Sequence, residues 1–415
     1  MKTIQKTYRY AILPDEDQKT LLAKHFGCVR WVFNHFLNER KEQYLLGGKS
    51  DNYYKQAATL TQLKKGEETE WLKEVNSQTL QYSLRCLDTA YLNFFRAKAK
   101  FPRFKSRRDK NSFTIPQFVT VEDCTLHIPK FKEGIKINLH RPLEGEIKHC
   151  TISKNTTGKY FVSILCEVEY EPFTKTGNEC GIDLGLKHLV ITSDGEKFKN
   201  NKYTKKYEKQ LRLAQKHLAH KDKGSNRYEN QRLKVALLHE KIANSRMDNL
   251  QKVSTELIKE YDLIALEDLN VKGMNAKCKP KQDETGRYLP NGQAAKSGLN
   301  RSISDASWGN FVRILTYKAE WNDKEIIRIG RFFPSSKLCS CGWINQNLKL
   351  SDRIWTCSYC GTTHDRDILA ANNILKEGKR IKSAGTVDHT RRAKIRPDFQ
   401  AQAMKREAHQ SSVDG

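Results

Sequence analysis

The chain contains no long apolar run and few acidic residues for its size. None of its 415 residues belongs to an uninterrupted apolar stretch of about 18, which excludes a membrane-spanning helix. Residues 1–6 lack the apolar core of a secretory signal, so we expect an intracellular, cytoplasmic protein without a membrane partner. Only 48 Asp and Glu accompany 74 Lys and Arg, giving a net charge of +26. This excess disfavours an enzyme for small molecules and indicates a polyanionic partner, with nucleic acid as the default.

The eleven cysteines divide into seven single residues and a cluster of four. Single cysteines in a reducing compartment are predicted to be small buried hydrophobic residues. The seven are Cys28, Cys86, Cys124, Cys150, Cys166, Cys180 and Cys278. The cluster pairs Cys339 with Cys341 and Cys357 with Cys360, and four thiolates form a closed structural zinc site. The first pair encloses one residue, so His364 could replace one thiolate. No HxxxH pattern is present, which disfavours a catalytic zinc.

The first part of the chain is predicted to hold a helical segment and a β segment. A short strand over 3–13 leads into a helix, and a second helical pattern covers 77–97. Alternating apolar residues toward the end of 112–170 favour short strands of a small barrel. The strand over 3–13 is expected to pair with this barrel.

Two groups of residues in this part are candidates for contact with nucleic acid. Polar and aromatic side chains near the helices could touch base edges. They are Tyr53, Tyr54, Lys55 and Gln81. The stretch 94–110 mixes basic residues, which hold phosphates, with aromatic residues, which stack on bases. Its candidates are Arg96, Arg103, Phe104, Lys105, Arg107 and Arg108.

A second domain is predicted to begin near residue 176. Its elements in chain order are three strands within 179–199, two basic helices within 204–260, a strand over 262–266, a helix from 304, a strand over 325–330 and a last helix from about 365. The polar stretch 271–300 is expected to be a mobile loop or lid. Ser304 is expected to be the N-cap of the helix that follows it.

Three acidic residues stand at the ends of elements that are predicted to be buried. Asp183 lies on the first strand of the second domain, Glu267 ends the fourth, and Asp367 begins the last helix. The first and fourth strands can lie side by side, so the acids would meet at one sheet edge in an RNase H-like arrangement. Two Mg²⁺ ions bridged by Asp183, with Glu267 and Asp367 as outer ligands, would activate water for phosphodiester hydrolysis. Asp365 is an alternative third ligand, and Arg366 could clamp the scissile phosphate or pair with an acid.

The chain resembles the TnpB family, RNA-guided DNA endonucleases that are encoded by insertion sequences and are similar to compact type V CRISPR effectors. The resemblance runs from Met1 to about Ala384. Besides the cysteine pairs, it rests on Phe-Pro-Arg-Phe-Lys at 101–105, Gly-Ile-Asp-Leu-Gly at 181–185, Leu-Glu-Asp-Leu at 266–269, Ser-Asp-Ala-Ser-Trp at 304–308 and Thr-His-Asp-Arg-Asp at 363–367. Two positions depart from the family pattern. The family usually has two residues between the first two cysteines, and it usually has Asn where this chain has Leu369.

The resemblance implies a multidomain α+β protein. It would combine an RNase H-like (RuvC) α/β nuclease domain, a zinc ribbon insertion, a helical recognition lobe and a small β-barrel wedge domain. The implied map is wedge 1–14 and 112–175, recognition lobe 15–111, nuclease 176–336 and 363–385, and zinc ribbon 337–362. The basic stretch 386–415 shows no periodicity, and its composition predicts a disordered tail.

The resemblance also implies the site residues and the partners. Asp183, Glu267 and Asp367 would be the catalytic acids, and the four clustered cysteines would hold zinc. The partners would be a guide RNA made from the element's end and double-stranded target DNA, in a monomeric ribonucleoprotein. Protein contacts would read a short motif beside the target, and RNA–DNA pairing would read the rest.

The sequence therefore leads to one main hypothesis and three alternatives. The main hypothesis is a Mg²⁺-dependent, RNA-guided DNA endonuclease. The alternatives are a guide-dependent repressor with impaired cleavage, a transposase that joins DNA ends, and a structural RNA-binding protein whose acids are incidental. Metal-dependent cleavage, end-joining products and metal independence would distinguish them.

Overall fold

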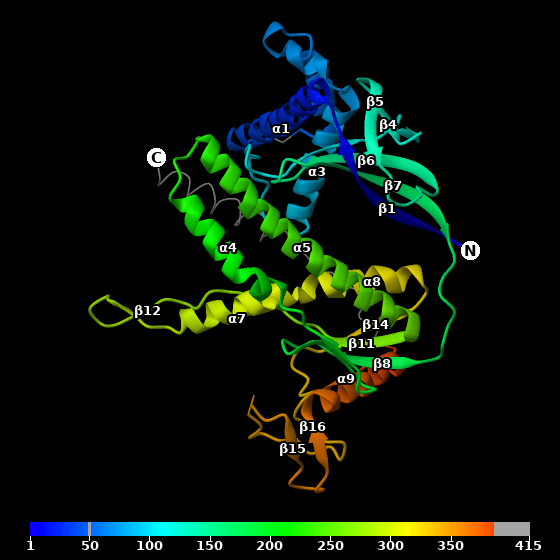
Figure 1. Cartoon of the computed structure of the whole chain (residues 1–415), viewed down its shortest axis with the longest axis vertical. Helices are drawn as coiled ribbons and strands as arrows, with labels where there is room; N and C mark the ends of the chain where they lie inside the picture. Colours follow the sequence, from blue (N-terminus) through cyan, green and yellow to red (C-terminus); the bar gives the residue numbers. More distant parts are fainter. Residues whose placement is uncertain (49–50, 350, 386–415) are drawn as a thin grey trace. The chain divides into compact units, whose positions relative to one another are not determined.

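The computed structural model describes residues 1–48, 51–349 and 351–385 (Figure 1). It divides these residues into two compact units, one formed by residues 3–169 and the other by residues 170–385 with residues 1–2. The tail predicted for 386–415 lies outside the described residues. Within the described ranges, no helix combines the length and the apolar character needed to cross a membrane.

The amino-terminal unit combines helices with a seven-stranded sheet. The helices are α1 (Glu16–Leu45), α2 (Tyr53–Leu63), the 3-10 helix η1 (Glu67–Glu74) and α3 (Ser77–Phe95). The strands are β1 (Lys2–Leu13), β2 (Asn111–Ile115), β3 (Thr120–Glu122), β4 (Thr125–Ile128), β5 (Phe131–Asn138), β6 (Glu146–Lys154) and β7 (Tyr160–Tyr170). The sheet order is β2-β6-β7-β1-β5-β4-β3, which confirms that the N-terminal strand pairs with the later strands. Closure into a barrel stays a prediction.

Local signals in the sequence explain where α1 starts and how it is held. The Asp15 carboxylate accepts a hydrogen bond from the backbone amide of Gln18, and the Gln18 side chain accepts one from the amide of Asp15, forming a capping box. Near the other end of α1, Arg40 is buried. Its guanidinium donates to Gln56 of α2 at 3.1 Å and to Asp88 of α3 at 2.9 Å. The paired charge therefore joins three helices.

The second unit is built on a five-stranded sheet of order β10-β9-β8-β11-β14. Its strands are β8 (Glu179–Asp183), β9 (His188–Thr192), β10 (Lys197–Lys199), β11 (Leu263–Glu267) and β14 (Glu325–Ile329), and two small hairpins are β12 (Lys281–Gln282) with β13 (Tyr288–Leu289) and β15 (Ile354–Thr356) with β16 (Thr363–Asp365). Its helices are α4 (Tyr203–Ala219), α5 (Asn226–Glu260), α6 (Val271–Met274), α7 (Gln293–Ala306), α8 (Trp308–Trp321) and α9 (Arg366–Ser383). Strands β8 and β11 are parallel neighbours, as predicted for the first and fourth strands.

Both faces of this sheet are covered by helices. Along β11, Ile264 and Leu266 belong to the core that also contains residues of α5 and α8. Ala265, which lies between them, belongs to a separate cluster with Ile374 of α9. This alternation places α9 on one face and α5 with α8 on the other, as Figure 1 shows. Strands buried on both faces explain the continuous apolar run of β11.

Small residues allow α9 to lie very close to the sheet. A Cβ atom placed on Gly181 of β8 would overlap the backbone carbonyl of Ala371 in α9. A Cβ atom on Gly378 of α9 would stand 2.6 Å from the Cβ of Ala265, the register partner of Gly181 on β11. Only glycine fits at these contacts, so backbone packing sets the position of α9.

The segment 271–300, which was predicted to be a mobile loop or lid, contains α6, the β12–β13 hairpin and the start of α7. Its role as a lid stays a prediction. Ser304 lies inside α7, so its prediction as an N-cap was wrong. The next residue, Asp305, is buried and accepts hydrogen bonds from Thr204 of α4 and Arg246 of α5. The contacts of Asp305 with α4 and α5 thus hold residues 304–307, which local sequence signals had assigned to a helix start.

The prediction for the single cysteines was correct in part. Cys28, Cys150, Cys166 and Cys180 are buried, Cys278 is half-buried, and Cys86 and Cys124 are exposed. Cys124 occupies a turn between β3 and β4 with φ of +59°, and Cys86 lies on the solvent side of α3. Local position therefore outweighs the usual burial of cysteine at these two residues.

The close contact of α9 makes Gly181 a strong test of the fold. We expect Gly181→Ala to destabilise the protein by at least about 2 kcal/mol, because the added methyl group forces α9 away from β8. Urea unfolding would measure the change. Gly298→Ala is the matched control, since a Cβ at this helical position meets nothing within 4 Å. The control should be neutral or stabilising by up to about 1 kcal/mol, and equal stability of both variants would contradict the proposed contact.

Candidate active site and metal cluster

Three elements bring the predicted acids to one edge of the five-stranded sheet. Asp183 is the last residue of β8 and Glu267 the last residue of β11. Because these strands are parallel neighbours, their carboxyl ends lie at the same edge. Asp367 is the second residue of α9, which packs across both strands. The third acid therefore reaches this edge from the helix rather than from the sheet.

The electrostatics of Asp183 show that the three acids influence one another. Burial, and after it the negative charges of Glu267 and Asp367, together raise the pKa of Asp183 to about 7. The positive charge of Arg366 and the backbone amide of Leu184 oppose this rise in pKa. A half-buried group of like charges is unfavourable by itself, and a bound cation would relieve it.

Glu267 is held by residues that the sequence patterns did not identify. The Ser335 hydroxyl donates a hydrogen bond of 2.6 Å to the Glu267 carboxylate. Burial raises the pKa of Glu267, and this hydrogen bond opposes the rise. The side-chain amide of Asn373 in α9 donates to the carbonyl oxygens of Ser335 and Leu338, at 2.8 and 2.6 Å. Helix α9 thus fixes the loop that orients Glu267. The only sequence signal was the position of Ser335 just before the first cysteine pair.

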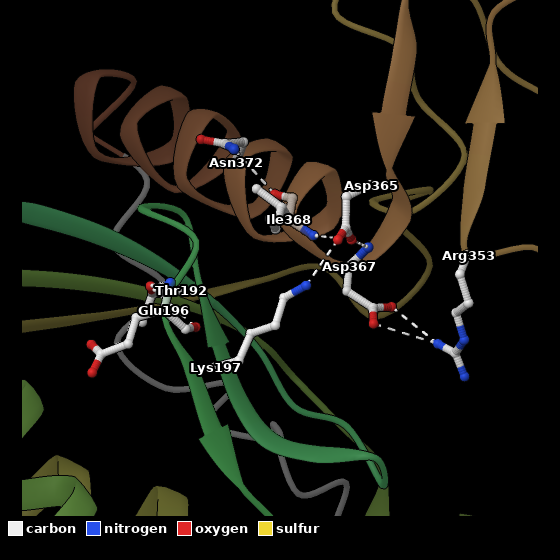
Figure 2. Close-up of polar contacts among 8 residues, drawn as sticks. All are labelled: Thr192, Glu196, Lys197, Arg353, Asp365, Asp367, Ile368 and Asn372. Carbon is white, nitrogen blue, oxygen red and sulfur yellow. Dashed lines mark hydrogen bonds and ion pairs between the residues drawn. The ribbon is translucent and has the colours of Figure 1, made fainter.

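The two candidate acids at the start of α9 have different surroundings (Figure 2). The Asp365 carboxylate accepts hydrogen bonds from the backbone amides of Asp367 and Ile368, so it is the N-cap of α9, and it pairs with Lys197 at 2.8 Å. Burial would raise the pKa of Asp365, but Lys197 and the two amides outweigh burial and hold this pKa low. Asp367 instead raises the pKa of Asp183.

Two arginines lie beside the third acid. Arg353, which directly precedes β15, pairs with Asp367 at 3.2 Å, as Figure 2 shows. The sequence patterns gave no sign of this contact. Arg366 donates a hydrogen bond of 2.9 Å to the carbonyl of Lys349 and lowers the pKa of Asp183 through its charge. Among the described residues Arg366 makes no direct ion pair with an acid.

The four clustered cysteines converge although the first pair encloses only one residue. Their sulfur atoms all lie within 4.8 Å of one another, with 3.6 Å between Cys339 and Cys360 and 3.8 Å between Cys341 and Cys357. Sulfur atoms around a tetrahedral zinc ion are separated by about 3.8 Å, so these residues suit such an ion. The His364 Nε2 atom lies 3.1 Å from the Cys339 sulfur. In the described parts of the chain, this is the one group of metal-binding side chains gathered so tightly.

Leu369, one of the two departures from the family pattern, packs beside this cluster. It is buried in a small apolar core with Cys339, Cys357 and Trp355. The attachment of α9 to the preceding loop is made by Asn373, one helical turn later. In this chain Leu369 thus packs in an apolar core, and Asn373 makes the hydrogen bonds between α9 and the loop.

Known proteins match this chain along most of its length. Residues 163–277 match a family model described as "Probable transposase", residues 308–374 one described as "Cas12f1-like, TNB domain", and residues 1–49 one described as "Helix-turn-helix domain". A candidate RNA-guided DNA endonuclease of Streptomyces pristinaespiralis is 38% identical over 93% of this chain and 92% of its own length. The chain belongs to the TnpB family.

Two further comparisons agree with this membership. A candidate RNA-guided DNA endonuclease of Escherichia coli K12 is 34% identical over 93% of this chain and 95% of its own length. The Cas12f1 chain solved in a complex with single guide RNA and target DNA has a TM-score of 0.52 at 12% identity. The match covers 90% of this chain and 99% of that one. At such low identity the likeness concerns the fold.

In this TnpB chain, the first group of predicted nucleic-acid contacts lies on α2 and α3. Tyr53, Tyr54 and Lys55 form the first turn of α2, and Tyr54 is 79% exposed. Gln81 is exposed on α3, one turn before Arg85, whose guanidinium lies 5.2 Å from the centre of the Tyr53 ring. The structure thus adds Arg85 to this group. Its spacing of four residues from Gln81 was the available signal.

The second group surrounds the connection between α3 and β2. Arg96 is the C-cap of α3, and Arg103, Phe104, Arg107 and Arg108 are all exposed in the following loop. Lys105 differs from them, because its ammonium lies 3.8 Å from the centre of the Phe33 ring and burial lowers its pKa. The backbone of Lys105 is also bonded to Asn34 of α1. This loop is therefore anchored to the helix.

The contrasting surroundings of Asp183 and Asp365 predict opposite effects of pH on stability. The pKa of Asp183 in the folded protein lies above its unfolded value of about 4, so its stabilising effect is lost as the pH rises through about 7. Without metal, the free energy of unfolding of Asp183→Asn should therefore be about 1–3 kcal/mol higher than that of the wild type at pH 8. The difference should shrink toward pH 4. Urea unfolding in EDTA would measure it.

Asp365→Asn is the matched comparison. The low pKa of Asp365 means that its stabilisation is present above pH 4 and is lost as the pH falls. The variant loses the Lys197 pair, so it should be destabilised by about 1 kcal/mol at pH 8. The same sign for both variants at pH 8 would contradict these different environments.

Proposed function

We propose that this TnpB protein is an RNA-guided, Mg²⁺-dependent DNA endonuclease. The observation that carries the proposal is the group of Asp183, Glu267 and Asp367, whose like charges meet at one sheet edge and raise the pKa of Asp183. Such a group is unfavourable without cations and suits the hard, oxygen-liganded Mg²⁺ ion. The names of the relatives and the likeness to the Cas12f1 fold support the same reaction.

The residues of the site have distinct proposed roles in an RNase H-like (RuvC) domain. Asp183 would bridge two Mg²⁺ ions, and Glu267 with Asp367 would be the outer ligands. When bound, two such ions activate water and stabilise the leaving oxygen of a phosphodiester. Ser335 would orient Glu267 through its hydrogen bond, and Asn373 would hold Ser335. Asp365 would stabilise the start of α9 rather than bind metal.

The partners would be a guide RNA from the element's end and double-stranded target DNA. The net charge of +26 favours contact with a long polyanion. Exposed basic and aromatic residues after α3 offer phosphate contacts and stacking surfaces, and the α2–α3 group offers polar and aromatic side chains for the target-adjacent motif. A single chain would form the ribonucleoprotein, with residues 337–362 as a zinc ribbon.

In vitro cleavage tests the proposal. The protein would be co-expressed with its native downstream DNA. The purified complex would then be incubated with a plasmid that carries a guide-matched target beside a randomised flank. We expect a linear product with Mg²⁺ and none with EDTA, enriched for one flanking sequence. Asp183→Ala should lower cleavage by at least about 1000-fold, because a metal ligand is lost. RNA binding should stay within about twofold of the wild type.

The control and the contrary outcomes are specific. Asp365→Asn should cleave much more than Asp183→Ala, because its carboxylate is assigned to the helix cap. Cleavage that survives Asp183→Ala would refute the metal site. Motif-selective binding without any cut would support a repressor, joined DNA ends would support a transposase, and metal-independent RNA binding alone would support a structural role.

The cysteine cluster predicts one zinc ion per chain. Native mass spectrometry of the wild type should show this ion, and Cys357→Ser should lose it, because Cys357 is a buried member of the cluster. His364→Ala should retain zinc if four thiolates are the ligands. Loss of zinc in the histidine variant with retention in Cys341→Ser would show instead that His364 replaces a thiolate.

A further inference from the structure

A groove in the amino-terminal unit lies outside every site described above. One face of α1 and the adjacent 3-10 helix η1 line a cavity of about 740 Å³. Its wall residues include Gly27, Arg30, Trp31, His35 and Trp71. None of the residues that the sequence predicted to contact nucleic acid lines this groove. We call it the α1–η1 groove.

Aromatic rings form the wall of the groove and are held in place. The rings of Trp31 and His35 stack with their centres 4.6 Å apart and their planes 12° apart. Trp71 of η1 meets Trp31 edge-on at 5.3 Å, and its indole N–H donates a hydrogen bond to the carbonyl of Glu68. Burial lowers the pKa of His35, which favours a neutral ring. Fixed aromatic faces beside open space are suited to stack on a planar ligand.

The floor of the groove is a glycine in the middle of a long helix. Gly27 lies inside the 30-residue helix α1, where glycine is less favourable than alanine. A Cβ atom at Gly27 would meet nothing within 4 Å, so packing does not require glycine there. A larger side chain would instead project into the groove. A glycine at position 27 therefore keeps this part of the α1–η1 groove open.

The charges around the groove favour an anionic ligand. Arg30 lines it, and among the described residues no hydrogen bond or ion pair involves its guanidinium. Lys24 pairs with Glu74 at the rim. Asn34, also a wall residue, exchanges two hydrogen bonds of 2.8 Å with the backbone of Lys105. One wall residue of the groove is therefore bonded to the basic loop that follows α3.

We propose that the α1–η1 groove binds one unstacked nucleotide of the bound nucleic acid. The base would stack on the exposed Trp71 ring and meet the nearly perpendicular Trp31 ring edge-on, and Arg30 would contact its phosphate. A base buried in this way would fix the strand against α1 and lead it into the basic loop. The inference rests on the proposed function, because it assumes that the chain binds RNA or DNA.

Substitutions at Gly27 test the groove without weakening the helix. Gly27→Leu fills the open space, whereas Gly27→Ala makes a similar change in helix preference with little added volume. The probe is RNA transcribed in vitro from the DNA directly downstream of the protein's own gene, and filter binding measures Kd. We expect Gly27→Leu to weaken binding about tenfold and Gly27→Ala to stay within twofold. Both variants should melt at or above the wild-type temperature.

A second pair of variants separates stacking from simple packing. Trp71→Phe keeps an aromatic face and should retain most of the binding, while Trp71→Leu should lose about as much as Gly27→Leu. Ultraviolet crosslinking followed by mass spectrometry would identify the modified peptides. One arm would carry labelled RNA alone, and the other would carry the RNA complex with labelled target DNA. A crosslink to Trp31 or Trp71 in either arm supports the groove and identifies the strand that supplies the nucleotide.

The contrary results are distinguishable. If the wild type binds RNA and cleaves DNA but Gly27→Leu does both equally well, with no crosslink to either tryptophan, the groove inference is wrong and the proposed function stands. If the wild type binds neither nucleic acid, the proposed function fails first, and the groove inference fails with it.

Discussion

The close contact between α9 and the five-stranded sheet is the constraint on which the candidate site depends. Gly181 and Gly378 remove the side chains that would hold the helix away from β8 and β11. The same helix carries Asp367 at its start and Asn373 two turns later. Through Ser335, Asn373 also reaches Glu267. One packing contact therefore positions the third acid directly and the second acid through a loop.

The acidic group and the cysteine cluster are connected by contacts of α9. Near Asp183, like charges gather at a half-buried edge, and Asp367 is partly neutralised by Arg353. That ion pair joins α9 to the hairpin beside the cysteine cluster. Leu369, two residues after Asp367 in α9, packs against the same cluster. A metal bound by the cysteines would hold the hairpin, so the two regions are mechanically linked within one unit.

The amino-terminal unit differs from the second unit, because its helices carry aromatic and basic side chains on their solvent-facing surfaces. Buried Arg40 joins α1, α2 and α3, and this frame leaves the α1–η1 groove and the loop after α3 on its surface. Asn34 connects the two surfaces by fixing the backbone of Lys105. Lys105 itself faces Phe33. A basic sequence run therefore contains residues with structural and with exposed positions, and only their contacts separate them.

The sequence alone determined the order of the strands of the five-stranded sheet along the chain, the long helices α1, α3, α4, α5 and α9, the adjacency of β8 and β11, and the residue types at the candidate site, but not α2, α6 or the division between α7 and α8. These features depend on periodicity and on short motifs, which act locally. The sequence could not decide between Asp365 and Asp367, could not reveal Ser335 or Arg353, and was misleading for Ser304 and Cys124. A tight turn with positive φ decided the exposure of Cys124, and hydrogen bonds and ion pairs, most of them with residues far along the chain, decided the other cases. Such contacts leave no periodic signal, so only the tertiary structure could show that Asp365 caps α9 and that the shortened cysteine pair still converges.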